Sequence, residues 1–361
     1  MQPIDSAYLI VGAGACGLAF ADTLLAEAPG VTITIVDERA APGGHWIDAY
    51  DFVKTHQPAS FYGVNSTQLG EDRIDSAGLN AGFYDLASGA EIRAYFADVM
   101  ERVLLASGRV RYIPESRYDF ERRVLATSDG DIAVRARKIV DTTYTAGPIP
   151  ATHTPSYAIS PGVRHAPVNA LAGPEGEAAR YVIIGAGKTG ADACVYLIER
   201  GVDPDAIIWI MPQDVWFYDR ALYQPGDEHL DHLFELTAVQ LEIAATARSA
   251  DEVLLRLEQS GALMRIDPCV APGAYRCATI TRAEMEVMRR VKKIVRLGRV
   301  QRLERDRIVL DRGEIPTGPD VLHVDCSAKA VRPRPPLPVF DGDRITVQFV
   351  RTCQPPFCAA F

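Results

Sequence analysis

Two glycine-rich segments carry the clearest chemical signal in the chain. They are Gly12-Ala13-Gly14-Ala15-Cys16-Gly17 and Gly185-Ala186-Gly187-Lys188-Thr189-Gly190. Both have the G-x-G-x-x-G spacing, in which the first glycine allows a tight turn, the second lets a diphosphate approach the backbone and the third permits close helix–strand packing. Backbone N–H groups at a helix N-terminus attract phosphate. The spacing therefore predicts two dinucleotide sites, and the alternative for each is a set of glycines that serve packing alone.

Both segments lie in the context that such a site requires. An apolar run precedes each one and a helix-forming stretch follows, and then comes a second apolar run. In chain order these runs are Tyr8–Val11, Leu18–Ala28, Val31–Val36, Tyr181–Ile184, Ala191–Arg200 and Ala206–Ile210. Strand, glycine turn, helix and strand form the βαβ unit of a parallel, doubly wound sheet. Asp37 ends the second strand of the first unit, next to Glu38, where a carboxylate can accept hydrogen bonds from an adenosine ribose.

The downstream elements repeat as well. Alternating apolar residues around a glycine turn predict hairpins at 124–130 and 307–313, and each is followed by a strand, at 138–143 and 321–327. The chain therefore consists of two nucleotide-binding modules.

Composition excludes several other classes of function. The 361 residues include 38 Lys and Arg against 47 Asp and Glu, a net charge of −9, which disfavours nucleic acid and anionic membranes as partners. The seven cysteines are spread along the chain, which favours reduced thiols in the cytoplasm over a disulfide framework. We find no signal-peptide pattern, and the apolar stretch 8–21 is too short to span a membrane. His229 and His232 sit at helical spacing, but no cluster that predicts a metal site accompanies them.

A third motif identifies a family resemblance. Gly43-Gly44-His45-Trp46 follows the first unit, and with it the sequence resembles the two-dinucleotide-domain flavoproteins, in particular the flavin-containing and Baeyer–Villiger (class B) monooxygenases. In that family the Gly-Gly turn lies near FAD and the next segment runs beneath the isoalloxazine. The resemblance implies FAD contacts from Gly12, Gly14, Ala15, Cys16, Gly17, Asp37, Glu38, Gly44, His45 and Trp46. The alternative is a surface turn with a buried tryptophan.

Two further residues are candidates for the flavin site. The segment Ser60–Ser66 is similar to the family segment that bears an active-site Asn-Ser, which would place Asn65 near the flavin as the catalytic residue. A turn role for Asn65 is the alternative, because asparagine favours turns. Gln57 is a second candidate for a flavin contact.

The second glycine segment resembles the family's NADPH domain. It implies nicotinamide dinucleotide contacts from Gly185, Gly187, Lys188, Thr189 and Gly190. Relatives that choose NADPH place an arginine around Met211, and methionine cannot replace that charge. Lys188 or Arg220 could reach the phosphate instead, so NADPH, NADH or a loss of nicotinamide binding remain open.

The resemblance also divides the chain into domains. The fold class is α/β, with two Rossmann-like (FAD/NAD(P)-binding) domains, the second inserted in the first, and a helical insertion. The expected parts are a first FAD domain segment at 1–150, a linker at 151–176, the NAD(P) domain at 177–315 with its helical insertion at about 227–295, and a return to the FAD domain at 316–361. Capping boxes at Ser249-x-x-Glu252 and Thr281-x-x-Glu284 predict helix starts within the insertion.

The last residues allow two interpretations. Cys353 and Cys358 have the C-x4-C spacing of some disulfide reductases, although burial as small apolar residues is commoner. The segment 352–361 is otherwise expected to begin a helix whose N-terminus faces the flavin.

The resemblance implies an FAD-dependent oxidoreductase reduced by NADPH or NADH. Such an enzyme oxygenates a small organic substrate with O2 through a flavin hydroperoxide. Two alternatives remain: an FAD-dependent oxidase or dehydrogenase without nicotinamide, and a non-enzymatic dinucleotide-binding sensor. A homodimer is compatible with the sequence, as is a monomer.

Overall fold

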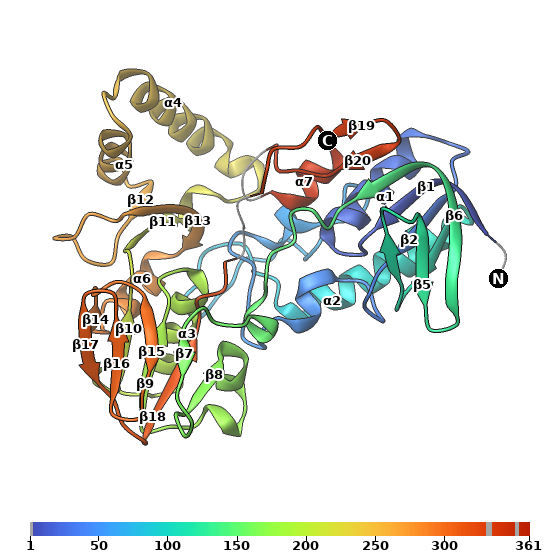
Figure 1. The fold of residues 1–361 in the computed structure, drawn as a ribbon. Coiled ribbons are helices and arrows are strands. Elements are labelled where there is room, and N and C mark those ends of the chain that lie inside the picture. The colour runs from blue at the N-terminus through green and yellow to red at the C-terminus, as the bar shows by residue number, and fades with distance from the viewer. Residues whose placement is uncertain (1–2, 330–333, 351–353) are drawn as a thin grey trace.

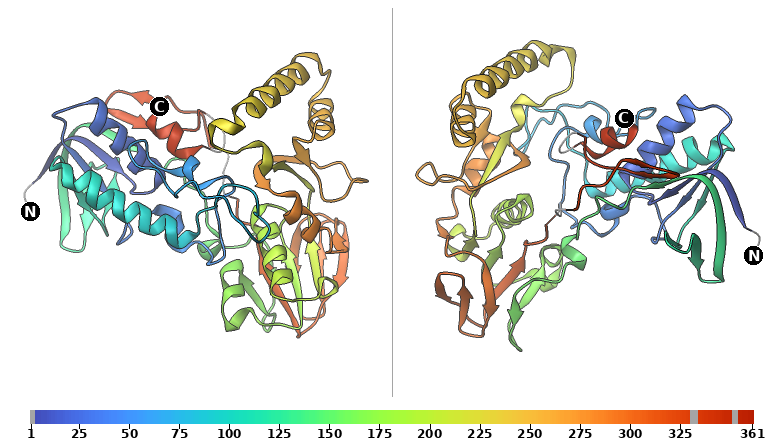
Figure 2. Two further views of the ribbon diagram at one scale, coloured as in Figure 1. Left: turned by 180° about the vertical axis from the view of Figure 1, so that it is seen from behind. Right: turned by 45° about the horizontal axis from the view of Figure 1, so that its top comes forward.

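The protein consists of two α/β modules that lie side by side (Figure 1). The computed structural model describes residues 3–329, 334–350 and 354–361. Elements from both ends of the chain form one module and the middle of the chain forms the other, as the further views also show (Figure 2). Within the described ranges, no helix combines the length and the apolar character needed to cross a membrane.

The first module is an eight-stranded sheet built around β1 (Ile4–Val11). The strands run in the order β19-β20-β6-β1-β2-β3, with β5 paired to β6 and β4 to β5. Their bounds are β2 Ile33–Val36, β3 Val110–Ile113, β4 Arg117–Asp119, β5 Val124–Thr127, β6 Gly130–Asp141, β19 Phe340–Asp341 and β20 Arg344–Thr346. Strand β1 pairs in parallel with both β2 and β6. The expected hairpin at 124–130 is confirmed as β5 and the start of β6.

Both faces of this sheet are covered, which explains why its central strand is apolar at successive residues. Ile10 points into a core shared with α1 (Ala15–Glu27) and α2 (Gly89–Asp98). Leu9 points to the opposite core, beneath the β4–β6 strands. A short C-terminal helix, α7 (Pro355–Ala360), packs along α1.

The second module repeats this plan. Its five-stranded parallel sheet has the order β14-β10-β9-β18-β8. The bounds are β8 His165–Pro167, β9 Arg180–Ile184, β10 Ile207–Ile210, β14 Lys293–Val295 and β18 Val321–Asp325. Helices α3 (Lys188–Glu199) and α6 (Arg282–Met288) cover one face. The other face packs against a four-stranded sheet of β7 (Ala158–Ile159), β15 (Val300–Leu303), β16 (Arg307–Leu310) and β17 (Gly313–Pro316).

The second module extends beyond the expected boundaries at both ends. The segment 151–176, expected as a linker, contributes β7 and β8 to the two sheets of this module. Strand β18 pairs with β9, so residues 321–325 belong here and not to a return that starts at residue 316. All five residues of β18 are buried, as an interior position between β9 and β8 requires. The chain rejoins the first sheet at β19.

The expected helical insertion is only partly helical. Helices α4 (Leu230–Thr246) and α5 (Ala250–Gln259) project from the molecule (Figure 1), but strands follow them. β12 (Leu263–Met264) and β13 (Ala274–Ile280) flank β11 (Val215–Asp219) in a three-stranded sheet. In β13, Tyr275 and Arg276 are exposed and the last three residues are buried. The capping box at Thr281 and Glu284 is confirmed, and Ser249 caps α5 through the Glu252 amide.

Candidate functional site: two glycine turns

The first glycine turn has a backbone that only glycine allows at two of its positions. Gly12 has a φ of +107°, in the region that side chains disfavour. A Cβ on Gly17 would lie 1.9 Å from the carbonyl oxygen of Gly12, so this close helix–strand contact requires glycine as well. The second turn has the same design, with Gly185 at a φ of +132° and a Cβ on Gly190 at 2.2 Å from the Gly185 oxygen.

Each turn ends at a helix N-terminus that no side chain caps. Helix α1 begins after Gly14 and α3 after Gly187, and neither has a capping side chain or an acidic residue in its first turn. The free amide groups and the positive end of the helix dipole suit a phosphate. A Cβ on Gly187 would meet nothing within 4 Å, so the backbone there is open to a ligand. Both turns therefore fit a dinucleotide diphosphate.

The Gly43–Gly44 turn lies directly against the first glycine turn. The Gly43 amide donates to the Ala13 carbonyl at 2.9 Å, and a Cβ on Gly44 would lie 3.0 Å from the Cα of Gly14. Gly43 and Gly44 have φ values of +128° and +57°. The two backbones can approach this closely only because glycine stands on both sides. The Gly12–Gly17 turn and the Gly43–Gly44 turn therefore form one structural unit.

The residues that follow this turn reach the boundary between the modules. Trp46 is half-buried and packs against the cores of both modules, whereas His45 is exposed. Tyr50 is buried in the core of the second module, and the ring of Phe52 stacks on Tyr196 of α3 with a centroid distance of 3.9 Å. The segment that follows Trp46 therefore joins the two modules.

Asp37 is buried and holds the first turn in shape. Its Oδ2 accepts the Ala13 amide at 2.6 Å and its Oδ1 accepts the Arg39 amide at 2.8 Å. Each carboxylate oxygen has a second lone pair, so Asp37 can still accept from a ribose hydroxyl. Glu38 instead faces solvent and pairs with Arg117 at 3.4 Å.

Gln57 meets the C-terminal segment. The Gln354 amide donates to Gln57 Oε1 at 2.9 Å, just before α7 begins. The Cys16 thiol, next to Gly17 in the first turn, donates to the Pro355 carbonyl at 3.6 Å. Burial, reinforced by Cys358, raises the pKa of Cys16 to about 12, so its thiol remains protonated. Cys353, which sequence analysis paired with Cys358, lies outside the described residues.

Asn65 lies in an exposed turn between Val64 and Thr67. Its neighbour Ser66 is the residue that is held, because the Ser66 amide donates to Asp22 of α1 at 2.9 Å. This position matches the turn role that sequence analysis left open for Asn65.

Lys188, at the start of α3, is not free for a phosphate in this structure. Its ammonium pairs with Asp192, one helical turn along. Asp192 also accepts a hydrogen bond from the Tyr50 hydroxyl at 2.6 Å, so a carboxylate of the second module binds the first.

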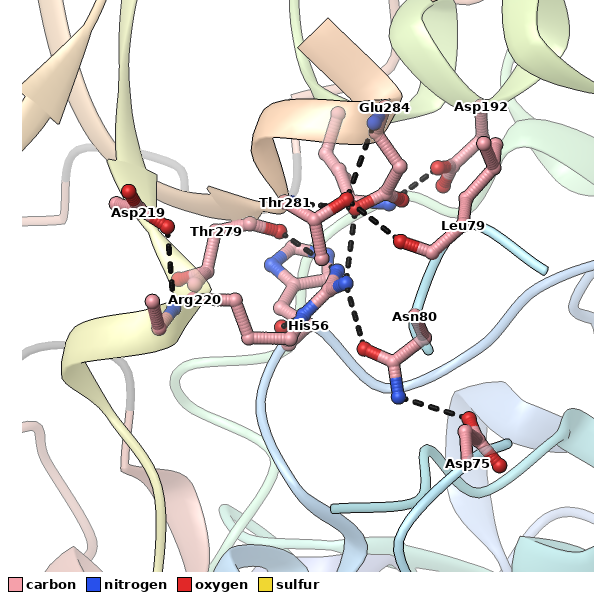
Figure 3. A network of polar contacts seen from close by, with 12 residues as sticks. His56, Asp75, Leu79, Asn80, Asp192, Asp219, Arg220, Thr279, Thr281 and Glu284 are labelled. Carbon is pink, nitrogen blue, oxygen red and sulfur yellow. Dashed lines mark hydrogen bonds and ion pairs between the residues drawn. The ribbon is translucent and has the colours of Figure 1, made fainter. Parts of the chain in front are cut away.

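Arg220, the other cation considered for phosphate binding, is fully buried between the modules (Figure 3). It pairs with Glu284 at 2.8 Å and donates to the Thr279 carbonyl at 3.2 Å within its own module. It also donates to the His56 carbonyl at 2.8 Å and to Asn80 Oδ1 at 3.1 Å in the first module. These contacts engage the guanidinium on all sides, so it has a structural role.

Sequence analysis missed the residues that surround Arg220. Burial, then the charges of Lys188 and Arg220, lower the pKa of His56 from 6.5 to about 3, so its ring is neutral. Burial opposes ionisation of Glu284, but Lys188 and Arg220 outweigh it and hold the pKa of that carboxyl below its usual value. No local motif marks these residues, because His56 and Asn80 lie more than 100 positions before Arg220, and Glu284 lies in a later helix. An arginine within an apolar context is the only signal that the sequence offered.

In the described part of the chain, no three or more His, Cys, Asp or Glu side chains are grouped so that they could hold a metal ion. His229 instead lies against the ring of Tyr84.

The two glycine turns, each between a parallel strand and a helix, define an α/β fold with two Rossmann-like modules, the second inserted in the first. The family profile described as the NAD(P)-binding Rossmann-like domain matches residues 10–58. A flavin-containing monooxygenase from Stenotrophomonas maltophilia superposes with a TM-score of 0.51 at 18% identity, covering 98% of this chain and 88% of that one. Cyclohexanone monooxygenase from Rhodococcus sp. Phi1, described as bound to NADP+, gives a TM-score of 0.51 at 16% identity over 90% and 70% of the two chains. These similarities confirm the fold class.

Among curated proteins, the chain is 46% identical to "Uncharacterized protein Rv2000" of Mycobacterium tuberculosis strain H37Rv, over 100% of this chain and 67% of the relative. The protein Mb2023 of Mycobacterium bovis matches over the same lengths with the same identity. The chain therefore belongs to the family of these mycobacterial proteins. Their descriptions assign no activity, so its function has to be argued from the site.

Proposed function

We propose that this protein is an FAD-dependent oxidoreductase of the monooxygenase type. The first module would hold FAD and the second a nicotinamide dinucleotide as the source of electrons, for the oxygenation of a small organic substrate with O2 in the cytoplasm. One observation carries the proposal: the same uncapped helix N-terminus behind a glycine turn occurs twice, and the first copy alone is closed by Gly43–Gly44 and followed by Trp46. When bound, FAD supplies the redox chemistry and the reaction with O2.

The protein's own residues would bind and orient FAD and shield it from water. The amide groups at the start of α1 hold the diphosphate, and Asp37 fixes the turn and accepts from the ribose. Trp46, Tyr50 and Phe52 lie at the boundary between the modules, where apolar side chains keep water from a redox centre.

The similarity to solved monooxygenases supports the choice of reaction. Their printed names give the chemistry that this fold performs elsewhere, including one chain bound to NADP+. The described contacts support FAD at the first module more strongly than a nicotinamide at the second, since Lys188 is already paired there.

The absorption spectrum of purified protein tests the proposal. We expect the protein to be yellow, or to become yellow with FAD, and to bleach when NADH or NADPH is added without oxygen. FMN is the matched control, because it lacks the adenosine half that the Gly12–Gly17 turn and Asp37 recognise, and it should not bind.

A protein that stays colourless with excess FAD contradicts the proposal. If FAD binds but neither nicotinamide bleaches it, the flavin site stands and the reductant is the substrate itself.

A further inference from the structure

The strand registers of the two modules identify which residues occupy the same position. Val11 pairs with Val36 in the first sheet and Ile184 with Ile210 in the second. The next residues are Asp37 and Met211. Each donates its amide to the neighbouring strand of its sheet, Asp37 to the Ile113 carbonyl at 3.3 Å and Met211 to the Val295 carbonyl at 2.9 Å. Met211 therefore stands where Asp37 stands in the first module.

This position commonly decides between dinucleotides. A carboxylate there accepts from the 2′-hydroxyl of the adenosine ribose, and an arginine nearby accommodates a 2′-phosphate. Met211 is fully buried and can do neither. The end of β10 therefore provides no cation for a 2′-phosphate.

The neighbouring strand does provide one cation, Arg296. It directly follows Val295 at the end of β14, the strand beside β10, and so lies at the same edge of the sheet. Parallel strands place their carboxyl ends at one edge, where open α/β sheets bind their ligands.

The guanidinium group of Arg296 is already paired with a carboxylate. Its Nε donates to Asp214 Oδ1 at 2.7 Å and its Nη2 to Asp214 Oδ2 at 2.9 Å. Asp267 lies 3.3 Å from the same Nη2. This two-point geometry is the one that a phosphate would use, so Asp214 takes the place of the phosphate.

Displacing the Asp214 carboxylate from Arg296 would cost free energy. Its side chain is 4% exposed, and removal of its partner would leave a buried charge without compensation. Its backbone is held too, because the Asp214 carbonyl accepts the amides of Gly273 and Ala274 at 3.1 and 3.2 Å. A 2′-phosphate placed beside the intact pair would instead face the two carboxylates of Asp214 and Asp267.

We propose that the second module selects NAD(H) over NADP(H), and that the Asp214–Arg296 pair is the residue pair that rejects the 2′-phosphate. The inference rests on the proposed function in one respect, that the second glycine turn binds a nicotinamide dinucleotide. NAD(H) carries an uncharged hydroxyl at this position, so it leaves the pair intact.

Calorimetric titration of the FAD-loaded protein with NAD+ and with NADP+ tests the proposal without turnover. We expect NAD+ to bind about tenfold more tightly or better, since one uncompensated charge contact is worth at least that factor. Rates of flavin reduction by NADH and NADPH should show the same preference.

Asp214→Asn tests the assigned pair, because it keeps the shape and removes the charge. It should raise the affinity for NADP+ about tenfold and change that for NAD+ by less than about twofold. Addition of Arg296→Met to this variant should abolish the gain. Asp219→Asn is the matched control: Asp219 is also buried and paired with an arginine, Arg282 at 2.8 Å, and its loss should leave the ratio of affinities unchanged.

Equal or tighter binding of NADP+ by the wild-type protein overturns the inference, even if Asp214→Asn does not fold. Binding of neither dinucleotide also overturns it. The flavin proposal fails separately, and only if FAD itself does not bind.

Discussion

The two glycine turns share a backbone and differ in what surrounds it. Both have a first glycine at positive φ and a third glycine packed on the carbonyl of the first. The first turn has two further glycines and the buried carboxylate of Asp37 next to it. The second turn has an open backbone at Gly187, and the apolar side chain of Met211 occupies the position of Asp37. The glycine pattern therefore fixes the backbone shape of both turns, and the proposed choice of dinucleotide depends on the residues beside them.

The largest effect is expected from removing the shared backbone geometry. Gly17→Ala places a Cβ at 1.9 Å from the Gly12 oxygen, so the turn has to move. At about 3 kcal/mol for such overpacking, affinity for FAD should fall about 100-fold. Flavin absorbance after gel filtration measures it.

Gly187→Ala is the contrasting variant in the other module, at the second glycine of its turn. Its Cβ meets nothing within 4 Å, so the protein should fold and retain FAD like the wild type. Loss of FAD in both variants would show that the two turns are not the independent sites that the comparison requires.

A smaller effect is expected at the position that distinguishes the modules. Asp37→Ala leaves the amides of Ala13 and Arg39 without their acceptor, at about 1–3 kcal/mol for a buried donor. We expect FAD to bind about tenfold more weakly by fluorescence titration. Met211→Leu, at the matching position, should change FAD binding by less than about twofold; equal losses would contradict the assigned roles.

The last expected effect concerns the stability of the protein, not cofactor affinity, and its dependence on pH at the boundary between the modules. The unfolded chain binds a proton at His56 below pH 6.5, but the folded chain excludes it until about pH 3. The free energy of unfolding should therefore fall as the pH falls below 6.5, by at most about 1.4 kcal/mol per pH unit from this group.

Thermal unfolding between pH 7 and pH 5 measures this dependence. His56→Gln should flatten it, whereas His232→Gln, at an exposed position of α4, should not. An unchanged slope in His56→Gln would show that His56 is not the group that titrates.

Local patterns in the sequence predicted the elements and the turns. Glycine spacing, apolar runs and the capping box at Thr281 each depend on residues close in sequence, and the structure confirms them. Strand partners depend on distant residues. That is why β18 was expected in the wrong module, and why β13 was hidden within a segment expected to be helical.

The candidate site shows the same difference between contacts that are local in the sequence and contacts that depend on the tertiary fold. Asp37 and the Gly43–Gly44 turn lie within 30 residues of the first glycine turn and were singled out from the sequence, whereas Arg220 meets Asn80 and His56 only through the tertiary fold. Asn65 was chosen by a short resemblance, and the fold places it in an exposed turn.

The guanidinium of Arg220 also limits how the protein can move. It is 1% exposed and bonded to both modules, so a rotation of one module against the other would strip its contacts where no water can replace them. The contacts of Arg220 therefore oppose small rotations of the two modules against each other and are lost together when the modules separate. Two dinucleotides bound as proposed, one to each module, would therefore keep a constant orientation toward one another.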